Sequence, residues 1–346
     1  MPDVISDTLV AAAPPVRDRR SGWKRRGISA LSVAVSAVLL LAIYRTMDLR
    51  RVEDALVHAN KVWMVVSIAM ILPITVLRAL RFFLVAPAGA LPSIAEALRL
   101  TLVASALNVF LPAKTGDLIK SYFVARRSDT AAGVAVSVIV YERVSDLFGL
   151  TFWCLAGWAI GRPQVAGLPA MFWALLAGLG ALCGLLIASE RIATALCALV
   201  SATFSHRRLR RIRDLADGWP QLLRALRGRR LSIVAFSLLL WLTHLCQLWM
   251  FTVTLALSIP FMVVASLSAI ALMAGQLPFT VAGLGTRDAA LVLLLAAYTP
   301  PEAAAAMGIL IATRGFLPPL FGVPVMRPYL VSVVDEARRW RLRTAR

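Results

Sequence analysis

Apolar residues form long uninterrupted blocks along the chain, separated by short charged segments. Residues 27–44, 163–189 and 231–286 contain no Asp, Glu, Lys or Arg. A helix that crosses the hydrocarbon core of a bilayer needs roughly 20 apolar residues, whereas the strands of a membrane barrel alternate apolar and polar residues. These blocks do not alternate, so the pattern predicts an all-α polytopic membrane protein.

The lengths of the blocks predict about six full spans. The expected spans lie near residues 27–44, 62–80, 130–161, 168–188, 231–257 and 303–326. Two further apolar stretches, which begin at residues 100 and 260, are each broken by a Leu-Pro pair and a polar loop. We expect both to form re-entrant helical hairpins, since non-helical backbone is tolerated at membrane depth where protein buries it.

The two halves of the chain repeat the same features in the same order. Each has a Leu-Pro break, a polar loop that ends in an aspartate (Asp117 or Asp288), and a later arginine in an apolar segment (Arg143 or Arg314). The aspartates and the arginines are both 171 residues apart (288 − 117 and 314 − 143). With both tails in the cytoplasm the repeats are inverted, an arrangement typical of secondary transporters. Chance agreement among a few residues is the alternative.

Composition and charge support this interpretation. The chain is 60% hydrophobic and carries a net charge of +19, concentrated in 1–26, 206–230 and from 327 onward. Basic residues beside spans mark the cytoplasmic side and attract anionic lipids, so this charge does not indicate nucleic-acid binding. We expect a multi-pass protein of a bacterial inner membrane with both termini cytoplasmic. Its expected parts are a basic tail (1–26), a first repeat (27–189), a basic cytoplasmic loop (190–230), a second repeat (231–326) and a basic tail (327–346).

The motifs of common enzymes are missing from the sequence. There is no H-E-x-x-H or G-x-S-x-G, and Lys114-Thr115 lacks the glycines of a phosphate-binding loop. The four cysteines have no metal-ligand spacing. We therefore expect no enzyme activity, no cofactor and no metal. An intramembrane transferase would have Glu142 as its best base, and His244 is interpreted as a core histidine rather than a proton relay.

Charged residues inside the predicted spans are the candidate site. A charge at a helix centre costs roughly 2.5–3.5 kcal/mol on insertion scales, so it persists where it is paired, hydrated or bound to a substrate. Architectural ion pairs are the alternative to a substrate site. We predict a substrate-binding role for twelve residues: Asn108, Lys114, Asp117, Lys120, Glu142, Arg143, Asp146, Gln276, Thr280, Arg287, Asp288 and Arg314. Arg78 and Arg81 are interpreted instead as interface anchors whose long side chains snorkel to the headgroups.

The same motifs resemble a known family. The order Asn108-x-x-Leu111-Pro112-x-Lys114-x-Gly116-Asp117, Glu142-Arg143-x-x-Asp146, Pro278-x-Thr280-x-x-Gly283-Leu284-Gly285-x-Arg287-Asp288 and Arg314 is similar to the flippase-like transmembrane domain of lysylphosphatidylglycerol synthases, over about residues 28–326. The resemblance implies a stand-alone lipid translocator, since the soluble synthase domain is missing from this sequence. Asp117 and Asp288 stand where glutamate is usual, and Val281-Ala282-Gly283 replaces Pro-Gly-Gly, so no particular substrate carries over.

The function expected from these features is lipid translocation, flippase- or scramblase-like and not driven by ATP. Arg143 and Arg314 would hold a phosphate, while Asp117 and Asp288 would contact cationic or hydroxyl groups or exchange protons. The expected partners are a membrane lipid, anionic inner-leaflet lipids at the basic segments, and a second copy or an envelope-biosynthesis protein. The alternative is a non-transporting scaffold for an envelope lipid or glycan assembly enzyme.

Overall fold

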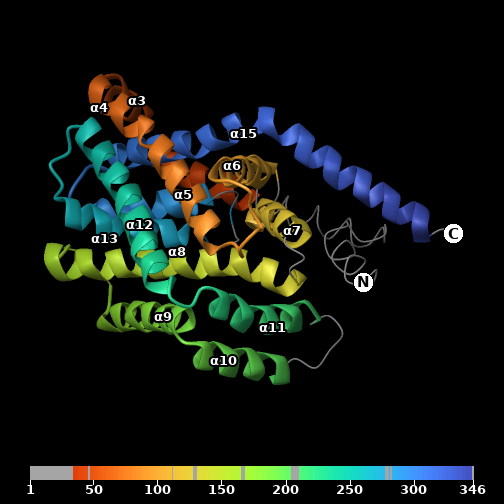
Figure 1. Ribbon diagram of the computed structural model, residues 1–346. Coiled ribbons are helices and arrows are strands. Elements are labelled where there is room, and N and C mark those ends of the chain that lie inside the picture. Colours follow the sequence, from red (N-terminus) through yellow and green to blue (C-terminus); the bar gives the residue numbers. More distant parts are fainter. Residues whose placement is uncertain are drawn as a thin grey trace.

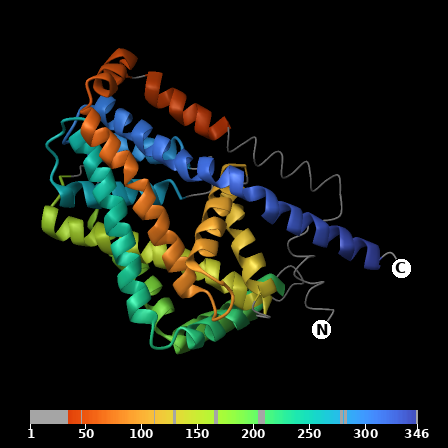
Figure 2. The ribbon, with the colours of Figure 1, turned by 45° about the horizontal axis from the view of Figure 1, so that its top comes forward.

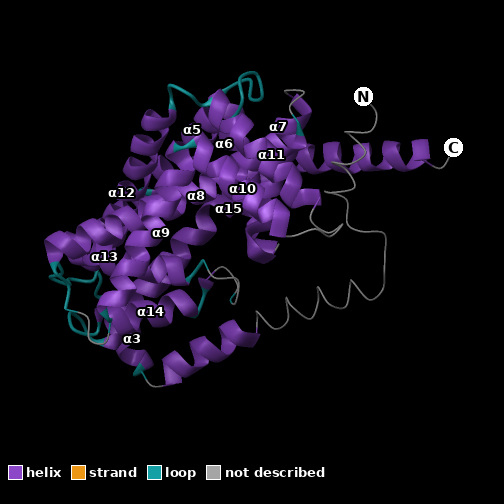
Figure 3. Cartoon of the chain, turned by 90° about the horizontal axis from the view of Figure 1, so that it is seen from below, coloured by secondary structure: helices purple, strands orange, loops and turns teal. Residues whose placement is uncertain are grey.

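The computed structural model of the chain describes residues 34–45, 47–110, 112–127, 131–164, 168–203, 210–276, 280 and 283–344. Within these residues every regular element is a helix (Figure 3). Five helices are long and apolar enough to cross a membrane: Lys61–Val85, Ala132–Gly161, Ala170–Ala188, Arg230–Thr254 and Pro301–Asp335. The all-α class is thus confirmed. The first expected span, 27–44, is described only from residue 34, as the shorter apolar helix Ala34–Arg45.

The helices follow one another along the chain with short connections (Figure 1). After the helix Ala34–Arg45, they are α3 (Leu49–Val57), α4 (Lys61–Ala69), α5 (Ile71–Val85), α6 (Ile94–Phe110), η1 (Pro112–Asp117), α7 (Leu118–Arg127), α8 (Ala132–Gly161), α9 (Ala170–Ala188), α10 (Glu190–Thr203), α11 (Arg210–Ala225), α12 (Arg230–Thr254), α13 (Phe261–Ala274), α14 (Thr286–Leu295) and α15 (Pro301–Thr344). Helices α4 and α5 together make the span Lys61–Val85.

Two pairs of short helices occupy the positions of the expected hairpins. Helices α6 and α7, joined by η1, follow the long span Lys61–Val85 and precede the long helix α8, and Figure 2 shows them as an adjacent pair in gold. Helices α13 and α14 likewise follow α12 and precede α15. The order long, short, short, long therefore occurs twice. The Leu111 and 277–279 breaks themselves fall outside the described residues.

Each pair of short helices packs against a long helix of the other half. Helix α13 packs on α8, and α6 packs on α15. Small residues allow both approaches, because a Cβ on Gly157 would lie 2.5 Å from the Met262 carbonyl oxygen and one on Gly322 would lie 2.2 Å from the Leu102 carbonyl oxygen. Such small-residue contacts let membrane helices pack closely. Each half therefore contributes a short helix that packs against a long helix of the other half.

Large apolar side chains are exposed on the outside of the long helices. They include Val65, Leu72, Met171, Leu175, Leu231, Leu239, Leu293 and Leu320. A soluble monomer rarely exposes this much contiguous apolar surface, whereas a bilayer solvates it. The exposed apolar side chains agree with a multi-pass membrane protein.

The segment expected as a basic loop, 190–230, contains helices α10 and α11. One face of α11 is buried against α8, through Trp219, Leu222 and Leu223, and Leu226, directly after the helix, continues this face. These residues follow the spacing of a helix face. Residues 206–230 contain nine arginines, and the segment was therefore interpreted as a basic loop. The apolar spacing that predicts α11 was missed.

The junction between α9, α10 and α12 is held by Glu190. Its carboxylate accepts hydrogen bonds from Arg230 and from Arg227 Nη2, the latter at 3.2 and 3.3 Å. Arg230 Nη1 also donates to the Ala188 carbonyl at 2.9 Å. Arg230, at the start of α12, therefore contacts both Ala188 of α9 and Glu190 of α10.

Lowering the pH is expected to loosen this junction. The hydrogen bonds from Arg230 and Arg227 hold the pKa of Glu190 below its ordinary value near 4.5. A depressed carboxyl pKa contributes stability that is present above the unfolded pKa and is lost as the pH falls through the folded one. Trp219, whose indole donates to the Leu186 carbonyl at 3.4 Å, should report the change by fluorescence below about pH 4.5. Glu190→Gln should remove this transition, and a transition of the same size in that variant would contradict the assignment.

Candidate functional site

The polar loop of the first half is fixed by two helices. Asp117, the last residue of η1, forms an ion pair with Arg143 of α8 and accepts a hydrogen bond of 3.1 Å from Asn108 Nδ2 of α6. Gly116 permits the loop to fold back on α6, since a Cβ there would lie 2.7 Å from the backbone nitrogen of Asn108. Asp117 is 5% exposed. Three of the expected site residues thus meet, and Arg143 neutralises the loop aspartate.

A second ion pair joins α7 to α8. Lys120 Nζ lies 3.2 Å from Glu142 Oε2, and both side chains are buried. The Lys120 ammonium also lies 4.8 Å from the centre of the Phe82 ring. The Glu142 carboxylate, the best candidate base in the sequence, is therefore held by a neighbouring cation.

A third pair corrects the interpretation of Arg81. Arg81 Nη1 lies 2.7 Å from Asp146 Oδ1, and Arg81 is 2% exposed. Asp146 also accepts a hydrogen bond of 3.1 Å from Trp241 Nε1 and lies 4.0 Å from Arg143 Nη1. The prediction that Arg81 snorkels to an interface is wrong, because Asp146 of α8 neutralises it inside the bundle. The buried Phe82 beside it was the available signal that this face of α5 points inward.

The polar loop of the second half holds its aspartate differently. Asp288 Oδ1 accepts hydrogen bonds from its neighbour Arg287, at 2.7 Å from Nη2 and 3.1 Å from Nε. Asp288 Oδ2 accepts one of 3.0 Å from the backbone N–H of Gly285. Arg287 Nη2 also donates to the Gly308 carbonyl at 3.3 Å, which ties the loop to α15.

Arg314 of α15 has neutral side chains as its described partners. Its Nη1 donates to Gln247 Oε1 at 2.6 Å and lies 3.3 Å from His244 Nδ1. Gln247 in turn donates to the Ser67 carbonyl at 2.7 Å. Arg314 is 8% exposed and forms no ion pair with any acidic residue among those described. His244 and Gln247 lie one turn apart on α12, and sequence reasoning did not assign either of them to the site.

The two halves therefore differ at matched positions. In the first half the loop aspartate binds the arginine that follows 26 residues later (143 − 117). In the second half Arg287 has taken that place at Asp288, and Arg314 is left without a carboxylate. Gly308 brings α15 against this loop, since a Cβ on it would lie 2.9 Å from Asp288 Oδ1.

Arg78 of α5 lies between the two groups. It interacts electrostatically with Lys120 and Asp146 on one side, and with His244 and Arg314 on the other. It forms no ion pair with a described carboxylate. Arg78 is thus close enough to interact electrostatically with charged residues of both halves.

The remaining expected site residues contribute less. The Thr280 and Thr286 hydroxyls are 2.9 Å apart across the second loop. Gln276 is half-buried beside it, and its backbone N–H donates to the Met273 carbonyl at 3.0 Å. The side chain of Lys114 lies outside the described part of the chain.

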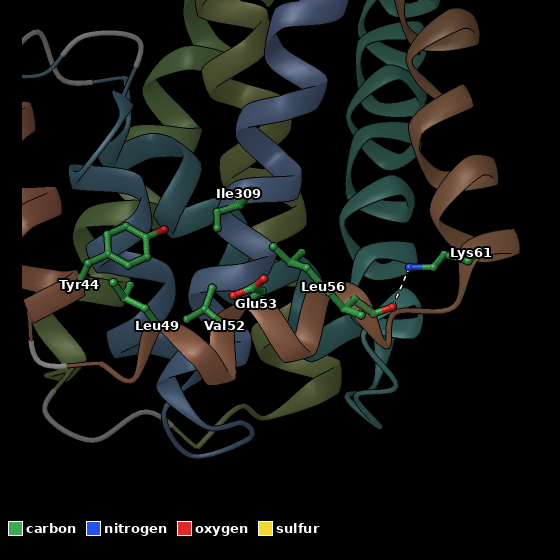
Figure 4. Close-up of a pocket in the computed structure, with 8 residues that line it drawn as sticks. Tyr44, Leu49, Val52, Glu53, Leu56, Lys61 and Ile309 are labelled. Carbon is green, nitrogen blue, oxygen red and sulfur yellow. Dashed lines mark hydrogen bonds between the residues drawn. The ribbon is translucent and has the colours of Figure 1, made fainter.

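A mostly apolar pocket adjoins the second loop (Figure 4). Its volume is about 420 Å³, and its lining comes from Tyr44, Leu49, Val52, Glu53, Leu56, Val57, Lys61 and Ile309. Lys61 Nζ donates to the Val57 carbonyl at 2.7 Å. Tyr44 interacts electrostatically with Asp288 and Arg287. Tyr44 is therefore the member of the lining that links the pocket to the Arg287–Asp288 pair.

Substituting Gly285 by alanine is expected to destabilise the second loop by about 1–3 kcal/mol. Gly285 has a φ of +93°, which favours glycine, and an added Cβ would lie 3.0 Å from the Leu39 Cβ. Thermal unfolding of the purified protein in detergent micelles should show a lower melting temperature. Gly178→Ala is the matched control, because no atom lies within 4 Å of the Cβ it would add. Equal melting temperatures of the two variants would contradict the loop geometry.

Comparison with known proteins places these features in a family. Residues 29–322 match the family described as the lysylphosphatidylglycerol synthase TM region. A UPF0104 membrane protein of Methanocaldococcus jannaschii is 22% identical over 300 residues, which cover 82% of this chain and 89% of that protein. The matched residues include both polar loops and the interior ion pairs. This multi-pass membrane protein therefore belongs to the family of the lysylphosphatidylglycerol synthase TM region.

Proposed function

We propose that the protein translocates a phospholipid or another envelope lipid across the inner membrane without hydrolysing ATP. The observation that carries the proposal is Arg314, a buried guanidinium held by two neutral side chains. A charge at that depth in a span is costly unless it is paired, hydrated or bound to a substrate. Since no described carboxylate pairs with Arg314, an anionic headgroup is the partner that the site lacks.

The proposed topology is that of inverted repeats. Helices α6–α7 and α13–α14 would enter the membrane from opposite faces as re-entrant hairpins, with both tails and residues 190–230 in the cytoplasm. The repeated order of long and short helices and the packing of each hairpin on the other half support this proposal. Inverted repeats with broken helices that meet near the midplane permit alternating access.

The unequal ion pairs suggest how access would alternate. In the described conformation Arg143 binds Asp117, while Asp288 binds Arg287 and leaves Arg314 free of carboxylates. In the opposite conformation we propose the mirror arrangement, in which Arg314 binds Asp288 and Arg143 is released. A headgroup would then meet an uncompensated arginine from one half in each state.

The pocket beside the second loop would hold part of an acyl chain. Its lining is mostly Leu, Val and Ile, with Glu53 and Lys61 as its charged members. Apolar lining with a few polar groups is typical of lipid and small-molecule sites. The headgroup would lie toward the Arg287–Asp288 pair, and the acyl chains would stay in lipid.

Transport of labelled lipid tests the proposal. The full chain is reconstituted into liposomes that contain a trace of acyl-labelled fluorescent phospholipid, and a membrane-impermeant reductant is added outside. Proteoliposomes should lose more fluorescence than the outer-leaflet fraction that empty liposomes lose. The proposal would be overturned if proteoliposomes lost no more fluorescence than empty liposomes in all three conditions: with no gradient, with a proton gradient and with a membrane potential.

A scaffold without transport is the second candidate, and the closed ion pairs Lys120–Glu142 and Arg81–Asp146 favour it. Buried pairs of this kind are often architectural. The scaffold hypothesis predicts that variants of the arginines lower the amount of folded protein and nothing else. Measuring transport per folded protein separates the two functions.

A further inference from the structure

We infer that Arg78 and Arg314 form an anion site for a phosphate group whose carrier has a net negative charge. The inference rests on the proposed function for how the ligand arrives, but binding itself does not require transport. It deepens that function by naming the class of headgroup. Three observations support it: the partners of the cations, the net positive charge of the interior group, and the ion pairs that already occupy its four acids.

Arg314 is the first element of the site. It is 92% buried (100 − 8), and its described partners, Gln247 and His244, carry no negative charge. Arginine has only donors, so a hydrogen bond to His244 Nδ1 requires the unprotonated nitrogen. Arg287 of the next loop adds a like charge nearby. The planar guanidinium matches the oxygens of a phosphate, which it binds through two parallel hydrogen bonds.

Arg78 and Arg81 supply further donors on the facing helix α5. Arg78 is half-buried and acts electrostatically on Arg314. The two helices meet here, since Leu77, next to Arg78, and Leu317, about one turn after Arg314, pack on the same apolar cluster. Arg81 Nη1 is paired with Asp146 at 2.7 Å, but Arg81 Nε is a buried donor without an acceptor among the described residues. The Ser145 hydroxyl, next to Asp146, is also buried without a described partner. Unsatisfied buried donors beside two cations favour an acceptor-rich ligand.

The charge balance identifies the class of ligand. Around the two polar loops and Arg78 there are six described cations and four acids: Arg78, Arg81, Lys120, Arg143, Arg287 and Arg314 against Asp117, Glu142, Asp146 and Asp288. Glu96 of α6, a further buried acid, is not counted because it is paired with Arg127 at 2.8 Å. Two positive charges remain (6 − 4). A phosphomonoester carries about −1.5 to −2 near pH 7, which matches this excess.

The four acids argue against a cationic headgroup. Each already has a partner, since Asp117 binds Arg143, Glu142 binds Lys120, Asp146 binds Arg81 and Asp288 binds Arg287. No carboxylate of this set is free to receive an ammonium group. A headgroup with an amine would bring its charge toward Arg78 and Arg314, where like charges repel.

Binding by the full-length protein in detergent micelles tests the inference. Native mass spectrometry would compare lipids with identical acyl chains: phosphatidic acid, phosphatidylglycerol and phosphatidylethanolamine. We expect affinity to fall in that order. Arg314→Gln and Arg78→Gln should each weaken phosphatidic acid binding about tenfold or more, the usual cost of one hydrogen bond to a charged group. The control is Arg229→Gln, which removes one charge from an exposed arginine of the basic surface.

Each outcome decides the inference. Equal binding of phosphatidic acid and phosphatidylethanolamine would overturn it, and so would an equal loss in Arg229→Gln. Inorganic phosphate that displaces the lipid at comparable concentrations would support the anion site and assign it to free phosphate. Arg314→Lys keeps the charge, so it should retain part of the binding even if Arg314→Gln folds poorly. Selective binding without transport in liposomes would overturn the proposed function alone.

Discussion

Replacing Lys120 with methionine is expected to destabilise the folded protein by about 3–5 kcal/mol. Lys120 Nζ lies 3.2 Å from Glu142, and both side chains are buried, at 4% and 7% exposure. Methionine fills much of the same space but leaves the Glu142 carboxylate without its ion-pair partner. An uncompensated buried charge costs far more than the pair contributes. Unfolding of the purified protein by a graded addition of denaturing detergent measures the loss.

The double variant Lys120→Met with Glu142→Leu distinguishes a buried pair from a specific requirement for lysine. Replacing both members of a buried pair with apolar residues is often neutral or stabilising, so the double variant should recover most of the lost stability. A double variant as unstable as Lys120→Met would show that the packing of α7 on α8, rather than the charge, carries the effect. The same pair tests the transport proposal, since a recovered fold with unchanged lipid transport would remove Lys120 and Glu142 from the substrate site.

The class of the protein and most helix positions could be predicted from the sequence. Uncharged blocks fix where a helix can cross a membrane, and the expected spans 130–161 and 168–188 match Ala132–Gly161 and Ala170–Ala188 closely. The Leu-Pro breaks likewise located the two pairs of short helices. These features depend on local composition, which a single sequence contains in full.

The partners of the charged residues could not be predicted in the same way. Asp146 binds Arg81 from a helix 65 residues earlier (146 − 81), and a sequence does not show which faces of two helices meet. The repeat offset matches Asp288 and Arg314 of the second half with Asp117 and Arg143 of the first. Arg287, the adjacent residue, holds the Asp288 carboxylate, and Arg314 is turned toward α12. Matched spacing therefore related these residues to one another, while packing around Gly308, which the sequence does not show, set their pairs.

Arg314→Gln is expected to lower lipid transport per folded protein by about 10–100-fold. A hydrogen bond to a charged group is worth about 1.5–3 kcal/mol, and about 1.4 kcal/mol corresponds to a factor of ten. Glutamine can still bond to Gln247 and His244, so the neutral contacts that hold α15 to α12 are replaced in part. What it cannot supply is the positive charge that a headgroup would meet. Dithionite bleaching of labelled phospholipid in proteoliposomes, normalised to folded protein, measures the rate.

Two companion variants decide what a loss in Arg314→Gln means. Arg314→Lys keeps the charge but not the planar pair of donors, so its rate should lie between those of the parent and of Arg314→Gln. Arg229→Gln removes an exposed charge and should transport like the parent. If Arg314→Gln instead lowers only the amount of folded protein, while the rate per folded molecule is unchanged, the arginine is architectural and the scaffold function is favoured. A graded loss from Lys to Gln, with Arg229→Gln unaffected, would show that transport requires the positive charge at residue 314.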